Sequence, residues 1–177
     1  MIRLFVGLTL PDHHRQRLVH LSAGIEGARW VAAENLHITL RFIGEVDEDV
    51  GEDLAQALLG VRSDPFDVAL KGVGIFGHPP HSVWAGVLDT PSGALAHLHA
   101  SVESALVRTG LKPEGRKYTP HVTLARFRHV KAKQLASFLE TNVDLVCEPF
   151  SVTGFTLFQS HLTPRGAHYE NVADFEF

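Results

Sequence analysis

One pattern occurs twice in the chain: a histidine and a threonine separated by one apolar residue and followed by a leucine. The copies are His37-Ile38-Thr39-Leu40 and His121-Val122-Thr123-Leu124, and their apolar, β-branched surroundings favour strands over helices. Side chains alternate between the faces of a strand, so each copy presents an imidazole and a hydroxyl on one face and two apolar anchors on the other. The repeat predicts two strands that bury their apolar faces and turn their polar faces toward one shared cleft.

The interval between the two copies is found again elsewhere in the chain. His121 follows His37 by 84 residues, and Pro149-Phe150 follows Pro65-Phe66 by 84 residues as well. A weaker match relates the segments Phe5-Val6-Gly7-Leu8 and Trp84-Ala85-Gly86-Val87. This self-similarity predicts one bilobal domain over residues 1–177 with an internal duplication, whose lobes are related by a pseudo-two-fold axis.

Hydrophobic periodicity places strands and helices in the same order in both copies. Each copy is predicted to run strand, helix, His-x-Thr strand, helix and strand, and a last strand closes the chain. The expected strands cover residues 2–10, 29–31, 36–43, 66–76, 83–88, 122–127, 150–158 and 168–177, and the expected helices cover residues 11–23, 47–60, 95–106 and 131–141. The pattern predicts an α+β fold of two pseudo-symmetric lobes.

Composition excludes several classes of protein. A chain of 177 residues, 45% hydrophobic and 20% charged, can bury the core of a globular domain, and a net charge of -4 argues against a strongly basic nucleic-acid-binding module. Cys147 is the single cysteine, which excludes an internal disulfide and a Cys-rich zinc site. The apolar residues 1–10 end at Pro11, too early for a signal peptide or a membrane span. We expect a soluble cytoplasmic monomer with no membrane partner.

The pseudo-symmetry predicts a site for acid–base chemistry. An axis between the lobes would place His37 opposite His121, and two imidazoles that titrate near neutrality can serve as base and acid together. A phosphodiester needs both functions, on opposite sides of the phosphorus. The hydroxyls of Thr39 and Thr123 would donate hydrogen bonds to the non-bridging oxygens. Because the lobes are nearly equivalent, residue chemistry alone leaves open which histidine is the acid.

The residues around the two motifs resemble a known family. The relevant segments are Trp30-Val31 and Glu34-Asn35-Leu36 before the first motif, Pro120 before and Ala125-Arg126 after the second, and Leu157-Phe158, Ser160, Leu162 and Tyr169 near the end. Together with the paired tetrapeptides they resemble the two-histidine (2H) phosphoesterases, and most closely the RNA 2′,3′-cyclic phosphodiesterases, also called 2′-5′ RNA ligases. One departure is Ala167-His168-Tyr169, where the family commonly has a Gly-Tyr pair.

The resemblance implies a fold, an activity and residue roles. The fold would have lobes of antiparallel sheet with outer helices around a central groove, and the activity would be hydrolysis of a 2′,3′-cyclic phosphate at an RNA end to a 2′-phosphate. By the family pattern His37 is the proton donor to the departing 3′ oxygen, His121 is the proton acceptor that activates water, and Arg126 contacts the phosphate. RNA ends or small cyclic nucleotides would be the partners. No cofactor is implied, and the other histidines lack metal-ligand spacing, so we predict no metal.

Arg126, Phe76 and Tyr118 are candidates for substrate contacts, whereas the resemblance gives no firm role to Arg41. Arg126 lies five positions beyond His121 and has the wrong parity for the polar face, so we expect a bulge or the end of the strand to turn it inward. Arg41, four positions beyond His37, has the right parity. Phe76 and Tyr118 could stack on a base, although core packing is the commoner use of such an aromatic side chain.

Two alternatives remain open at this point. The histidine pair acts on the phosphate rather than on the base, so another cyclic or 2′-5′-linked nucleotide could be the substrate. A chain that retains the groove without turnover would be a non-catalytic binder of RNA ends. Weak 2′-5′ joining would be the reverse reaction of the same site, and turnover in the presence of EDTA separates an enzyme from a binder.

Overall fold

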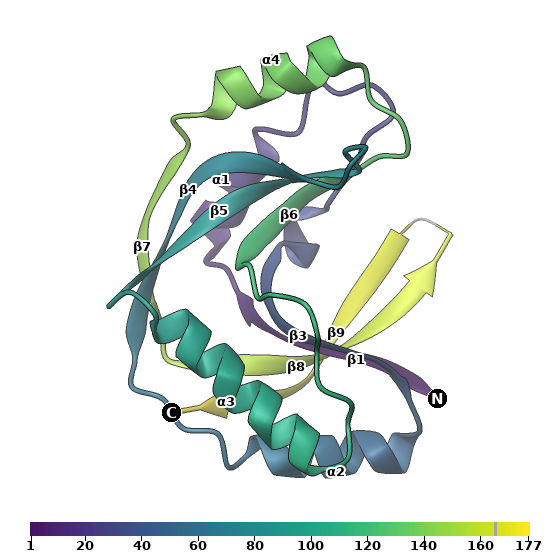
Figure 1. The fold of residues 1–177 in the computed structure, drawn as a ribbon, viewed down its shortest axis with the longest axis vertical. Helices are drawn as coiled ribbons and strands as arrows, with labels where there is room; N and C mark the ends of the chain where they lie inside the picture. Colours follow the sequence, from purple (N-terminus) through teal and green to yellow (C-terminus); the bar gives the residue numbers. More distant parts are fainter. Residues whose placement is uncertain (165) are drawn as a thin grey trace.

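A curled antiparallel sheet forms the body of the molecule, and helices lie around its outside (Figure 1). The computed structural model describes residues 1–164 and 166–177. Over these residues the strands are β1 (Ile2–Thr9), β2 (Arg29–Trp30), β3 (His37–Val46), β4 (Phe66–Phe76), β5 (Ser82–Thr90), β6 (His121–Arg126), β7 (Val146–Val152), β8 (Gly154–Thr163) and β9 (Gly166–Glu176). The helices are α1 (Asp12–Val19), α2 (Glu48–Leu58), α3 (Ala94–Arg108) and α4 (Ala132–Asn142), and a 3-10 turn covers Ala33–Asn35. The α+β class with outer helices agrees with the prediction.

The sheet consists of two halves that meet at the strands carrying the repeated motif. Along the sheet the order is β7-β4-β5-β6-β3-β1-β8-β9, and β2 pairs with β6. We call β3-β1-β8-β9 the first half and β6-β5-β4-β7 the second half. They are joined where Ile38 of β3 pairs with Val122 of β6. Both residues are fully buried, so the apolar anchors of the motifs hold the halves together.

Each half of the sheet contains one strand that its position in the sequence would assign to the other half. β4 follows α2 in sequence but pairs with β5 and β7, whereas β8 follows β7 directly but pairs with β1 and β9. The prediction of one strand over residues 150–158 is therefore wrong. The extended chain leaves β7 at Val152 and enters β8 at Gly154, and the two pieces pair in different halves.

A bulge in β3 changes which side chains face the cleft. Between Thr39 and Arg41 this strand contains one residue more than its partner β1, and the extra residue is Leu40. Leu40 and Arg41 are both buried, and Phe42 returns to the face that carries Thr39. The alternation of faces is thus broken, and the expectation that Arg41 shares a face with His37 is wrong.

The same bulge occurs in β6. Leu124 is the extra residue between Thr123 and Ala125 when β6 pairs with β5. Leu124 and Ala125 are buried, and Arg126 is exposed on the cleft side. The bulge predicted from the parity of Arg126 is confirmed.

β1 pairs with the first motif strand and β5 with the second. The residues at equivalent positions in β1 and β5 differ by two from those that the sequence match aligned. The sequence aligns Phe5 with Trp84, but it is Gly7 that pairs with Thr39 in the way Trp84 pairs with Thr123. An even shift leaves each side chain on the same face, so the alternation was predicted correctly although the partners were not.

Two further element ends differ from the predictions by three residues or more. The first helix stops at Val19 rather than residue 23, and the strand expected to end before Gly44 continues to Val46 because glycine adopts φ of 91° there. The last two strands form a hairpin that projects from the body (Figure 1). No helix in residues 1–164 or 166–177 is long and apolar enough to cross a membrane.

Candidate active site

The polar residues of both motifs meet at the junction of the two halves. β3 and β6 run antiparallel through the Ile38–Val122 pair, so the residues on either side of this pair face one another across the strands. The opposed pairs are His37 with Thr123, and Thr39 with His121. Directly opposed Cβ atoms are about 5 Å apart and diagonal ones about 7–8 Å. The two histidines are diagonal, so both lie at the one place where the halves of the sheet are joined.

His37 has both ring nitrogens hydrogen-bonded and aromatic rings around it. Its Nδ1 lies 2.7 Å from the carbonyl oxygen of Asn35, and its Nε2 lies 3.0 Å from Oγ1 of Thr39. The ring centroids of Phe5 and Tyr169 are 4.8 and 5.3 Å away. This burial lowers the pKa of His37 to about 4 against an opposing hydrogen bond to Asn35, so the ring is neutral at pH 7. A carbonyl cannot donate, so Nδ1 carries the proton and Nε2 accepts from the threonine hydroxyl.

His121 has one nitrogen bonded and the other open. Its Nδ1 donates to the carbonyl oxygen of Thr119 at 2.7 Å, whereas Nε2 has no hydrogen-bond partner among the described residues. The ring of Phe76 meets it edge-on with centroids 4.7 Å apart. Burial lowers the pKa of His121, the backbone hydrogen bond to Thr119 opposes this, and the positive charge of Arg126 adds to the lowering. A neutral imidazole with a fixed tautomer and an open Nε2 is suited to accept a proton.

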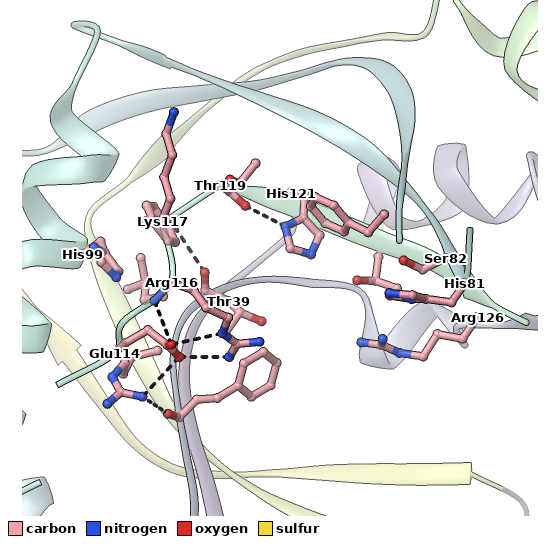
Figure 2. A pocket seen from close by; sticks show the side chains of 16 residues that line it. Thr39, His81, Ser82, His99, Glu114, Arg116, Lys117, Thr119, His121 and Arg126 are labelled. Atoms are coloured by element: carbon pink, nitrogen blue, oxygen red, sulfur yellow. Dashed lines mark hydrogen bonds and ion pairs between the residues drawn. The ribbon is translucent and has the colours of Figure 1, made fainter. Parts of the chain in front are cut away.

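A pocket of about 380 Å³ opens beside His121 (Figure 2). Six of the seven predicted site residues line it: Thr39, Phe76, Tyr118, His121, Thr123 and Arg126. His37 does not line the pocket, but its Nε2 is hydrogen-bonded to Thr39, which does. The hydroxyl of Thr123 has no hydrogen-bond partner in the part of the chain that the structure describes, and it remains available as a donor. The pocket therefore has His121 on its wall, and His37 is connected to it through the hydroxyl of Thr39.

Tyr118 is tied to β3 across the pocket. Its hydroxyl donates to the carbonyl oxygen of Thr39 at 3.2 Å, and its ring stacks on His99 with centroids 4.0 Å apart. Burial of the phenol raises its pKa. His99 already covers one face of Tyr118, so base stacking by Tyr118 stays a prediction that concerns its other face.

Phe76 is the last residue of β4, as predicted, and its ring lies beside that of His121. The neighbouring Trp84 lies over Gly74, and a Cβ at position 74 would come within 2.3 Å of the indole. Ring centroids of Phe76 and Trp84 are 5.3 Å apart. The glycine thus leaves space for the indole, which packs at a tilt against Phe76 on the strand that also carries Gly74.

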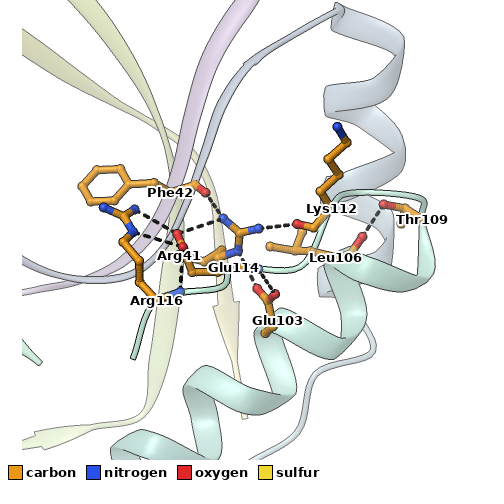
Figure 3. Close-up of polar contacts among 8 residues, drawn as sticks. All are labelled: Arg41, Phe42, Glu103, Leu106, Thr109, Lys112, Glu114 and Arg116. Carbon is orange, nitrogen blue, oxygen red and sulfur yellow. Dashed lines mark hydrogen bonds and ion pairs between the residues drawn. The ribbon is translucent and has the colours of Figure 1, made fainter. Parts of the chain in front are cut away.

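Arg41 is not a phosphate-side residue. It is 8% exposed, and its guanidinium donates to the carboxylate of Glu103 and to the carbonyl oxygens of Phe42 and Lys112 (Figure 3). Its Nη1 also lies 3.8 Å from the Glu114 carboxylate. The bulge in β3 turns the guanidinium toward Glu103 of α3, where its donors are taken by protein groups although the residue borders the pocket.

Several parts of the site were not predicted. The carbonyls that orient the histidines belong to Asn35 and Thr119, each two residues before its histidine, and this common spacing was a usable signal. The pocket residues Ser82, Arg116 and Lys117 come from a strand end and an irregular loop, and nothing in their sequence context marked them. No group of three or more His, Cys, Asp or Glu side chains suited to a metal ion was found within the described residues.

Comparisons with known proteins agree with this geometry. Residues 10–163 match the model of the 2′-5′ RNA ligase superfamily. The chain is 37% identical to an RNA 2′,3′-cyclic phosphodiesterase of Aeropyrum pernix over 80% of this chain and 82% of that protein. It is 33% identical to the protein of the same name from Archaeoglobus fulgidus over 99% of this chain and 100% of the relative.

A solved structure extends the likeness to the fold. The crystal structure of Escherichia coli LigT complexed with 3′-AMP superposes with a TM-score of 0.81 and 27% identity, covering 99% of this chain and 98% of that one. The curled sheet and the paired strand histidines therefore define a 2H-type phosphoesterase fold. The chain belongs to the 2′-5′ RNA ligase superfamily and, within it, to the RNA 2′,3′-cyclic phosphodiesterase family.

Proposed function

We propose that this protein hydrolyses 2′,3′-cyclic phosphate ends of RNA to 2′-phosphate ends, using His37 and His121 as an acid–base pair. The supporting observation is the diagonal arrangement of the two histidines across one β3–β6 pair, with a threonine opposite each. The names of the relatives support the substrate class. The same site, with a 5′ hydroxyl attacking the phosphorus in place of water, would join RNA ends through a 2′-5′ bond as the P–O3′ bond breaks.

The proton transfers follow from the hydrogen bonds of the two rings. His121 takes a proton from the attacking water at its open Nε2 while Nδ1–H stays on the Thr119 carbonyl. The new P–O bond forms as the P–O3′ bond breaks, and the 3′ oxygen receives the Nε2 proton of His37. Thr123 and Arg126 donate hydrogen bonds to the non-bridging oxygens.

The donor role of His37 requires the substrate. In the empty site burial holds the pKa of His37 near 4, so its Nε2 is unprotonated and accepts from Thr39. A phosphodiester anion beside the ring favours the imidazolium and raises this pKa. The hydroxyl of Thr39, no longer accepted by Nε2, can then turn to a phosphate oxygen. Binding of the anionic substrate thus protonates His37, so that it can act as the general acid.

Product analysis tests the proposal. An oligoribonucleotide with a 2′,3′-cyclic phosphate end is incubated with the protein in EDTA, since the scheme requires no metal, and 2′- and 3′-phosphate ends are separated chromatographically. We expect a 2′-phosphate product. A 3′-phosphate product would contradict the assigned roles, and binding without turnover would favour the non-catalytic binder of RNA ends. Turnover of another cyclic or 2′-5′-linked nucleotide, but not of RNA, would favour that substrate class.

A further inference from the structure

The irregular segment over residues 111–120, called here the wall loop, is held by a buried cation. The guanidinium of Arg41 donates to the Lys112 carbonyl at 2.7 Å, and its partner Glu103 accepts the backbone N–H of Glu114 at 2.7 Å through its other oxygen. Charge-assisted hydrogen bonds to a buried guanidinium are directional and strong. The wall loop is therefore pinned to β3 and α3 although it contains no helix or strand (Figure 3).

Two cations on the wall loop line the far end of the pocket. Arg116 donates from Nε and Nη2 to the Glu114 carboxylate at 3.0 and 2.9 Å, which orients the guanidinium and leaves its Nη1 donors without a partner among the described residues. Lys117 is exposed and makes no ion pair within residues 1–164 and 166–177. In Figure 2 both lie on one side of His121, and Arg126 lies on the other.

An exposed aromatic ring belongs to the same pocket. Phe42 is 50% exposed, and its backbone carbonyl is bonded to Arg41. Figure 3 shows Phe42 and Arg116 extending to the same side of β3, away from α3. A phenyl ring is a sequence-tolerant platform for a base, and neighbouring cations are a feature of grooves that bind single-stranded nucleic acid.

We propose that this end of the pocket binds the phosphodiester 5′ to the terminal nucleotide, so that a strand is a better substrate than a free nucleotide with the same cyclic end. Arg116 and Lys117 would contact that internucleotide phosphate, and Phe42 would carry the base between it and the cyclic end. The inference rests on the proposed function, because the cyclic phosphate must lie at His121 for the strand to extend past Phe42. The net charge of -4 makes this local pair of cations the means of recruiting the strand.

The experiment compares two substrates that differ in the internucleotide phosphate and the nucleoside attached to it. The kcat/KM values are measured for a nucleoside 2′,3′-cyclic phosphate and for a dinucleotide with the same cyclic end. In the wild type we expect the dinucleotide to be preferred by about tenfold, the effect of one charge-assisted phosphate contact. In Arg116→Gln/Lys117→Gln this preference should disappear, and the salt dependence for the dinucleotide should become weaker.

Lys112→Gln is the matched control, because Lys112 is an exposed cation of the wall loop that does not line the pocket. It should keep the dinucleotide preference. Equal kcat/KM for both substrates in the wild type, or an unchanged preference in the double variant, would overturn the inference while leaving the proposed function intact. Absence of turnover on both substrates would instead contradict the proposed function itself.

Discussion

The two halves of the sheet place different side chains at equivalent positions beside the histidines. In each half one row of three residues crosses the strands next to the motif and faces the cleft. In the first half the row is Phe158, Phe5 and Phe42, and in the second half it is Phe76, Ser82 and Arg126. One backbone arrangement thus presents a fully aromatic row on one side of the site, and on the other a row of one aromatic, one polar and one cationic residue.

This difference gives the histidines different environments. Phe5 and Phe158 of the aromatic row lie beside His37 together with Tyr169, and burial lowers the pKa of His37 to about 4. His121 has Phe76 on one side and the open pocket on the other, and its pKa is also lowered, mainly by burial. Residue identity and hydrogen bonds at Nδ1 are the same in both halves, so the distinction between acid and base must come from the surroundings.

The largest expected effect is the loss of either imidazole. His37→Ala and His121→Ala should each lower kcat on a nucleoside 2′,3′-cyclic phosphate by about a thousandfold, the usual worth of a general acid or base. The double variant should lose little more than either single one, because the two groups act in one step. His13→Ala, at an exposed histidine outside the site, is the control. Full activity in either variant would show that the histidine of that half of the sheet takes no part in catalysis, and the comparison of the two histidine environments would lose its meaning.

The second prediction concerns stability against acid. The folded state lowers the pKa of His37 from 6.5 to about 4, so the unfolded chain binds the proton more readily and stability falls as the pH drops through this window. The free energy of unfolding should lose up to about 3 kcal/mol from this residue between pH 7 and pH 4. Urea unfolding followed by circular dichroism should show a smaller loss in His37→Gln.

His13→Gln supplies the matched control for this measurement, because it removes an exposed histidine and leaves the aromatic row untouched. It should lose stability in acid as the wild type does. Identical acid profiles for the wild type and His37→Gln would show that His37 is not buried in its neutral form, and the contrast between the halves would disappear.

Much of the fold followed from periodicity and repetition. The repeated motif and its alternation predicted the two central strands and their buried anchors, and the parity of Arg126 predicted its bulge. The exchange of strands between halves was not predictable, because β4 and β8 carry the same local pattern whichever neighbour they pair with. Local pattern determines an element, and tertiary pairing determines its partner.

The site was predicted less completely than the fold. Arg41 was misplaced because a bulge is a property of a strand pair, and the sequence of β3 alone does not mark the extra residue. The wall loop cations could not be recognised because their position depends on Arg41 and Glu103, which are 62 residues apart in the chain. The duplication itself and the catalytic roles stay predictions.

The third prediction tests whether the two rows are interchangeable. Arg126→Gln should lower kcat/KM by about thirtyfold, because it removes a charge-assisted contact to the phosphate. Adding Phe42→Arg to this variant should not restore activity, since the equivalent position lies on the opposite side of the junction. Arg128→Gln, at an exposed residue outside the pocket, is the control. Recovery in the double variant would show that the halves are functionally alike.

The smallest expected effect is an offset between two pH profiles. The kcat/KM profile reports the free protein, in which burial lowers the pKa of both histidines, whereas the kcat profile reports the complex with a bound anion that raises them. Both profiles should be bell-shaped, and the optimum of kcat/KM should lie about one pH unit below that of kcat. Profiles measured in EDTA on a nucleoside 2′,3′-cyclic phosphate decide this. Coincident optima would mean that the bound phosphate does not raise the pKa of His37. The general acid would then have to be a residue of the second half of the sheet.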